Sequence, residues 1–65
     1  MTPEKFKHFR KQTLKLTQAE LGAILGFDRN RIRRLENGST EITNETVYAV
    51  YWLAFHGPKL PENLA

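Results

Sequence analysis

Residues 17–38 read TQAELGAILGFDRNRIRRLENG, and this stretch decides the fold because its helix-capping and glycine residues divide it into two short segments. Thr17 is a good helix N-cap, and Glu20, three residues later, completes a capping box. Gly26 stands where a helix ends in the left-handed conformation, and Asp28 is placed to cap the segment that follows. The pattern predicts two helices joined by a turn of about three residues.

The two predicted helices span residues 18–25 and 29–37, and we expect them to pack closely against each other. Short helices joined by a glycine-containing turn, the second of them rich in arginine, are typical of a helix-turn-helix motif. Gly22 is expected at the closest approach, because a glycine inside a helix costs ~1 kcal/mol relative to alanine and needs a packing reason. Gly26 permits the sharp turn. The apolar side chains expected to hold the angle between the helices are Leu21, Leu25, Ile32 and Leu35.

Two further helices are predicted outside this motif. Near the start of the chain a capping residue, Thr2, is followed by proline and an acid, which is a typical helix start. This helix should cover residues 3–13. After a polar loop, Thr43 or Asn44 caps the last helix, which continues to His56.

The expected fold is a single all-α domain over residues 1–65 with four to five short helices, because 65 residues are too few for a second domain. The motif occupies residues 17–37, and a tail follows over 57–65, in which 61–64 suit one extra turn. There is no cysteine for a disulfide or a thiolate zinc site. No apolar run approaches the length of a membrane span, and the polar start carries no signal segment. We therefore expect a soluble, cytoplasmic protein.

Positive charge is concentrated in the first two-thirds of the chain. Residues 1–41 carry nine Lys or Arg against five Asp or Glu, whereas residues 42–65 carry one against two. Four arginines fall within six residues, over 29–34, and the sequence pI is about 9.6. Clustered arginine in a basic domain favours a nucleic-acid partner. The alternative is a mildly basic surface that serves solubility alone.

Several fixed spacings in the motif agree with those of one known family. The residues concerned are TQAELG over 17–22, LG over 25–26, Ile32, and LENG over 35–38. With them the chain resembles the lambda repressor/Cro (Xre) family of helix-turn-helix proteins over roughly residues 6–55. The resemblance implies a five-helix DNA-binding domain, usually dimeric, that places the second helix of the motif in the major groove. The short form of the chain is similar to small phage and prophage repressors.

The outer face of the predicted helix 29–37 carries the candidate base-reading residues. With Ile32 and Leu35 facing inward, the remaining polar side chains project outward at roughly 100° steps. Arginine can pair with guanine O6 and N7, and asparagine with adenine N6 and N7. By position, the residues that resemble the family's base readers are Arg29, Asn30, Arg33 and Arg34. The alternative is a solvated basic face, although like charges at helical spacing repel one another.

Other polar residues are candidates for phosphate binding, because helix ends and loops present backbone N–H groups to anions. Gln18 matches the family position that bonds the DNA backbone and braces the first base reader. Arg31 lies to the side of its helix and is expected at a phosphate. The residues that follow the helix and suit the opposite strand are Asn37, Ser39 and Thr40. Gln18 as a plain helix start, and the last three as ordinary turn residues, are the alternatives.

Glu36 lies among several arginines, and we expect it to form an ion pair that supports the fold. In the family, the glutamate equivalent to Glu36 often pairs with an arginine of the first helix, and the pair orients the two helices. The resemblance makes Arg10 the candidate, with Lys11 as the alternative. Both stay open because the connection over 13–16 is about one residue longer than usual and lacks the family's glycine.

The last predicted helix has two apolar sectors, which indicates a second buried contact. The first sector is expected to face the core and contains Val47, Val50, Tyr51, Leu53 and Ala54. The second is expected to form a two-fold dimer interface and contains Tyr48, Trp52 and Phe55. The alternative is that Phe6, Phe9 and Leu60 or Leu64 cover this second sector within one chain.

The function expected from these residues is sequence-specific binding of double-stranded DNA. A homodimer on a palindromic operator, acting as a repressor or autorepressor, is the most concrete form of this prediction, and an activator is the variant. The alternative is a protein-interaction module, such as an antitoxin or anti-repressor, that uses the aromatic sector. We expect no enzymatic activity, cofactor, metal or small-molecule ligand, because the sequence shows no catalytic set and no phosphate loop. His56 suits a cation at a helix C-terminus.

Overall fold

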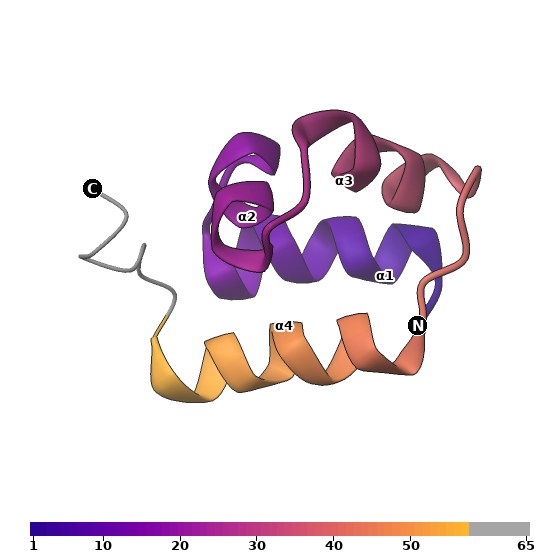
Figure 1. Ribbon diagram of the computed structural model, residues 1–65. Helices are drawn as coiled ribbons and strands as arrows, with labels where there is room; N and C mark the ends of the chain where they lie inside the picture. The colour runs from indigo at the N-terminus through magenta and orange to yellow at the C-terminus, as the bar shows by residue number, and fades with distance from the viewer. Residues whose placement is uncertain (58–65) are drawn as a thin grey trace.

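The computed structural model describes residues 1–57, and within that range every regular element is a helix (Figure 1). The elements are α1 (Pro3–His8), η1 (Phe9–Leu14), α2 (Gln18–Leu25), α3 (Arg29–Asn37) and α4 (Asn44–His56). Figure 1 shows α1 between α4 on one side and the α2–α3 pair on the other. The all-α class is confirmed, and α2, α3 and α4 have the predicted bounds. The turn predicted over 61–64 lies outside the described residues.

The first helix differs from the prediction, which ended it at residue 13. Its second half, η1, is a π-helix, and it runs to Leu14. The turn closes where the amides of Lys15 and Leu16 both donate to the carbonyl of Arg10. A π-turn holds one more residue than an α-turn, so it absorbs the extra residue of this connection. Lys15 then adopts the left-handed conformation, with a φ of 56°, where a glycine is more usual.

The core forms where α1, η1, α2, α3 and α4 meet. The buried apolar side chains are Phe6, Leu14, Leu21, Ile32, Leu35, Val50 and Leu53. Leu25 is only partly buried, at the rim of this cluster.

The buried side of α4 is narrower than predicted. It follows Thr46, Val50 and Leu53, which share one side of a helix because they are spaced four and three residues apart. Tyr51 and Ala54 are exposed, so the prediction that they face the core is wrong. Their positions lie outside this stripe on the helix.

Gly22 lies against the backbone of the turn that leads into α3. A Cβ atom placed on Gly22 would lie 2.5 Å from the carbonyl oxygen of Phe27. The Gly22 carbonyl in turn accepts the amide of Phe27 at 2.8 Å. Gly26 ends α2 in the left-handed conformation, with a φ of 76°. The close approach predicted for Gly22 is therefore to the turn and not to the side chains of α3.

Replacing Gly22 with alanine is expected to lower the free energy of unfolding by up to about 2 kcal/mol, measured by chemical denaturation. The new methyl group meets backbone that has to shift, at a cost of ~1–3 kcal/mol, and the ~1 kcal/mol that alanine gains in helix propensity offsets only part of this cost. Ala23→Gly is the control, since this exposed neighbour in α2 reports propensity alone. A Gly22→Ala protein more stable than the wild type would contradict the prediction.

Candidate nucleic-acid interface

The helix α3 is held at both ends and along its inner side. At its start the Asp28 carboxylate accepts the amide of Arg31 at 2.7 Å, and at its end Gly38 adopts the left-handed conformation. Ile32 and Leu35 are buried in the core. These contacts leave α3 one orientation relative to the domain, so its polar side chains point outward together.

The outer face of α3 is basic, exposed and without an acidic partner in the described structure. Its side chains expected to read bases, all exposed, are Arg29, Asn30, Arg33 and Arg34. Within residues 1–57 the only ion pair joins Arg10 to Glu36, so the arginines of α3 carry uncompensated charge there. Four arginines on one short helix repel one another, which an external anion would relieve.

Arg31 is set apart from this face by a contact that the sequence pattern did not suggest. Its guanidinium carbon lies 3.8 Å from the centroid of the Phe27 ring, within the range of a cation–π interaction. Phe27 belongs to the turn between α2 and α3 and packs against the core. The spacing of four residues is the only signal in the sequence for this pair.

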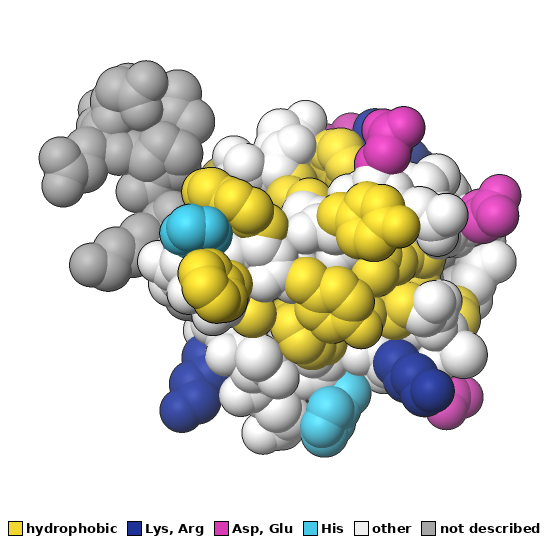
Figure 2. Space-filling view, turned by 90° about the horizontal axis from the view of Figure 1, so that it is seen from below, with side chains coloured by type: hydrophobic (Ala, Val, Ile, Leu, Met, Phe, Trp, Pro, Cys, Tyr) yellow, Lys and Arg dark blue, Asp and Glu magenta, His cyan; other side chains and the backbone are white. Residues whose placement is uncertain are grey.

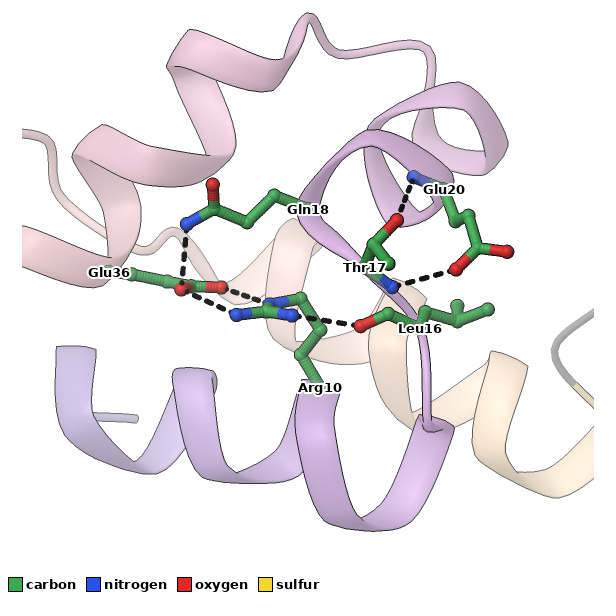
Figure 3. Close-up of polar contacts among 6 residues, drawn as sticks. All are labelled: Arg10, Leu16, Thr17, Gln18, Glu20 and Glu36. Carbon is green, nitrogen blue, oxygen red and sulfur yellow. Dashed lines mark hydrogen bonds and ion pairs between the residues drawn. The ribbon is translucent and has the colours of Figure 1, made fainter.

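Glu36 joins three elements through a buried ion pair (Figure 3). Its carboxylate accepts Arg10 Nε at 2.5 Å and Nη2 at 3.0 Å, and the two side chains are 7% and 4% exposed. Arg10 Nη1 donates to the Leu16 carbonyl at 2.8 Å, so the guanidinium also holds the chain between η1 and α2. Lys11, the alternative partner, is exposed. The bidentate geometry resists rotation of η1 relative to α3.

Gln18 lies at the first turn of α2 and donates from Nε2 to Glu36 Oε1 at 3.2 Å (Figure 3). Its amide is thereby fixed beside the last turn of α3. Thr17 caps α2 through the capping box, in which its hydroxyl accepts the amide of Glu20 at 3.1 Å. The sequence alone gives no signal for the bond between Gln18 and Glu36, because the two residues are 18 positions apart.

The residues after α3 form a compact turn next to Glu36. Asn37 Oδ1 accepts the amide of Ser39 at 2.9 Å. The amides of Ser39 and Thr40 also donate to the carbonyl of Arg34, at 3.0 and 3.3 Å. Since Gln18 bonds the neighbour of Asn37, the structure brings these candidate phosphate-binding residues to the same end of α3 and leaves Arg31 at the other.

A second surface lies on α4, on the side away from the core (Figure 2). We call its four side chains the aromatic face: Tyr48, Tyr51, Trp52 and Phe55, which are 69%, 51%, 60% and 85% exposed. Figure 2 shows hydrophobic side chains gathered on this side of the molecule. Tyr51 is an addition to the predicted set. The ring of Phe9 meets it edge-on at 5.3 Å between centroids.

The side chains predicted as the alternative cover leave this face largely exposed within the described part of the chain. Phe6 is buried in the core, and Phe9 packs against the core and meets the ring of Tyr51. Leu60 and Leu64 lie outside the described residues. The imidazole of His56, at the C-terminal end of α4, lies 4.1 Å from the indole of Trp52 between centroids.

Two short helices with a tight turn, the second presenting an unpaired basic face, define the chain as a helix-turn-helix DNA-binding domain. It belongs to the lambda repressor/Xre-like helix-turn-helix family, whose family model, described as Helix-turn-helix, matches residues 6–50. The domain is that of a DNA-binding transcription regulator, and the family is not an enzymatic one. Neither the curated proteins nor the solved structures gave a match. No helix among the described residues has the length and apolar character to cross a membrane.

Proposed function

We propose that the protein is a small dimeric repressor that inserts α3 into the major groove of a palindromic operator. The observation that carries this proposal is that the four arginines of α3 have no carboxylate partner within residues 1–57. A major groove about 12 Å wide admits one α-helix. The arginines would meet guanine edges or phosphates there, which removes their mutual repulsion.

Base reading is assigned to the side chains most directly opposite the core. Asn30 and Arg34 are four residues apart and share the outward line of α3, opposite Ile32 and Leu35. Arg29 and Arg33 flank that line on the same exposed surface. Their forked donors and acceptors match guanine and adenine edges, and each good bidentate pair contributes ~1–3 kcal/mol of discrimination.

Phosphate contacts are assigned to the two ends of α3, with α2 beside it. Gln18 and the turn over 37–40 lie together at the C-terminal end, where backbone and side-chain donors are close. Arg31 lies near the N-terminal end, beside the turn. Contacts on both sides of the reading helix would fix its register on the duplex.

The aromatic face supports a two-fold dimer. Exposed aromatic side chains on one helix are typical of protein interfaces, and packing α4 against α4 of a second copy would bury them. In an antiparallel arrangement Tyr48 would lie opposite Phe55 of the second copy, with Tyr51 and Trp52 near the axis. One short helix reads few bases, whereas the dimer would read two half-sites ~34 Å apart.

In the simplest form of regulation, expression of the target gene would depend on the concentration of this protein. A dimer bound over a promoter would exclude RNA polymerase, and binding at its own promoter would limit its own expression. This role would place the protein in the cytoplasm with the DNA. A reporter gene under the bound promoter distinguishes repression from activation. Lower expression in the presence of the protein supports a repressor, and higher expression indicates an activator.

Selection of bound duplexes from a random pool tests the proposal directly. We expect enrichment of a palindrome whose half-site centres are ~10 bp apart, because the two reading helices would contact one face of the duplex. Failure to enrich any sequence would contradict operator binding. Enrichment of a single, non-repeated half-site would contradict the dimer alone.

On the selected operator, Arg34→Ala is expected to weaken binding by about 5- to 150-fold and to relax the base preference at one position. The reason is the loss of a bidentate contact to a base edge. Lys7→Ala is the control, since this change removes the same charge from an exposed residue that belongs to α1 and not to α3. Its effect should be small and equal for all sequences. Equal effects of the two changes on specificity, read from binding to single-base operator variants, would contradict base reading by α3.

A second candidate function rests on the same aromatic face. Tyr48, Trp52 and Phe55 would also suit a different protein, as in an antitoxin or anti-repressor. Binding to random duplex DNA at two salt concentrations separates the candidates. DNA binding should fall steeply, by about tenfold or more between 50 and 200 mM salt, whereas an aromatic-anchored complex should change little.

A further inference from the structure

We infer that Phe27 is a positioning residue for DNA binding, because it holds the Arg31 guanidinium in place for a phosphate. The inference rests on the proposed function and adds to it a residue that touches no DNA itself. Its basis is the stacking of Arg31 on the Phe27 ring at 3.8 Å, next to a reading helix whose other arginines have no such support among the described contacts.

The ring of Phe27 and the backbone of Arg31 are each held by their own surroundings. Phe27 is half-buried against the core, and its amide donates to the Gly22 carbonyl at 2.8 Å. The backbone of Arg31 is tied to the Asp28 carboxylate at 2.7 Å. The ring is therefore a rigid platform at the end of α3, and the guanidinium lies on it in a defined place.

A stacked guanidinium keeps its N–H groups available. The donors lie in the plane of the group, so one planar face rests on the ring while the edges remain free for a bidentate bond to phosphate. A free arginine would lose side-chain entropy on binding, and Phe27 reduces that loss in advance. It also holds Arg31 despite repulsion from the other cations of α3.

The competing explanation is that the stack only stabilises the fold by covering the ring of Phe27. The two explanations differ in what depends on Arg31. If Phe27 acts through Arg31, its effect on DNA affinity disappears when Arg31 is absent. If Phe27 acts on the fold alone, its effect on affinity stays the same in both backgrounds.

A double-mutant cycle on the selected operator tests this, with duplex affinity measured over a series of salt concentrations. Phe27→Leu keeps the residue apolar and is expected to weaken binding by about two- to fivefold, the range of an exposed cation–π contact. Phe27→Tyr retains the ring and should bind like the wild type. Arg31→Ala should reduce the slope of log affinity against log salt by about 1, since one phosphate contact is lost. In that background Phe27→Leu should have no further effect.

Phe27→Leu alone should leave the salt slope unchanged, because every charge is still present. Far-ultraviolet circular dichroism checks that each variant is folded at the temperature of the assay. Additive effects of Phe27→Leu and Arg31→Ala would overturn the inference, as would an unchanged affinity in Phe27→Leu or an unchanged salt slope in Arg31→Ala. Each of these results leaves the proposed function intact. A wild-type protein that binds no duplex overturns both.

Discussion

Replacing Glu36 with alanine is expected to lower the free energy of unfolding by about 3–5 kcal/mol. The change leaves the Arg10 guanidinium buried, with the Leu16 carbonyl as its remaining acceptor, and it also removes the acceptor of the Gln18 amide. Small domains have only ~5–15 kcal/mol of stability in total, so the variant should unfold at a much lower denaturant concentration. Equilibrium denaturation followed by circular dichroism measures the difference.

Glu41→Ala is the matched control, because it removes the same charge from an exposed position and should change stability by less than ~0.5 kcal/mol. The double change Arg10→Met with Glu36→Leu removes both charges, and its cost should be smaller than that of Glu36→Ala alone. If Glu36→Ala lost no more stability than Glu41→Ala, the buried ion pair would not hold α3 in place.

Replacing Trp52 with glutamate is expected to weaken self-association by ~100-fold or more, because each copy would bury an unpaired charge in the proposed interface. The side chain is 60% exposed and lies outside the core, so the single chain should remain folded. Sedimentation equilibrium measures the association. Operator affinity should fall with it, since a monomer contacts only one half-site.

Gln12→Glu is the control for this change, as it adds the same charge at an exposed position of η1 that is not among the four side chains of the aromatic face. It should sediment like the wild type. A Trp52→Glu protein that still forms dimers would remove α4 from the interface. A wild type that stays monomeric when bound to its operator would refute the dimer itself.

The outer face of α3 and the aromatic face of α4 are connected through η1, which contacts both helices. Arg10 belongs to η1, which packs against α4, and the Arg10–Glu36 pair connects η1 to α3. The distance between the two reading helices of the proposed dimer would thus depend on this ion pair and on the aromatic face together.

Much of the fold could be predicted from the sequence because its signals are local. Thr17 with Glu20, and Asp28 with the Arg31 amide, act within three residues, and the structure contains both caps. The bounds of α2, α3 and α4 follow from such short-range bonds. The exposed basic line on α3 could also be predicted, since burial of Ile32 and Leu35 sets the direction of every other side chain.

The sequence by itself determined where the helices of the motif begin and end and which side of α3 is basic, because caps, turns and helical periodicity depend on neighbours in the chain. Only the tertiary structure decided that η1 takes an extra residue as a π-turn, that Tyr51 joins the aromatic face, and that Gln18 bonds Glu36. These features depend on which distant groups fill the core and satisfy buried charge. Such competition between contacts is settled when the helices pack, and no local pattern records its outcome.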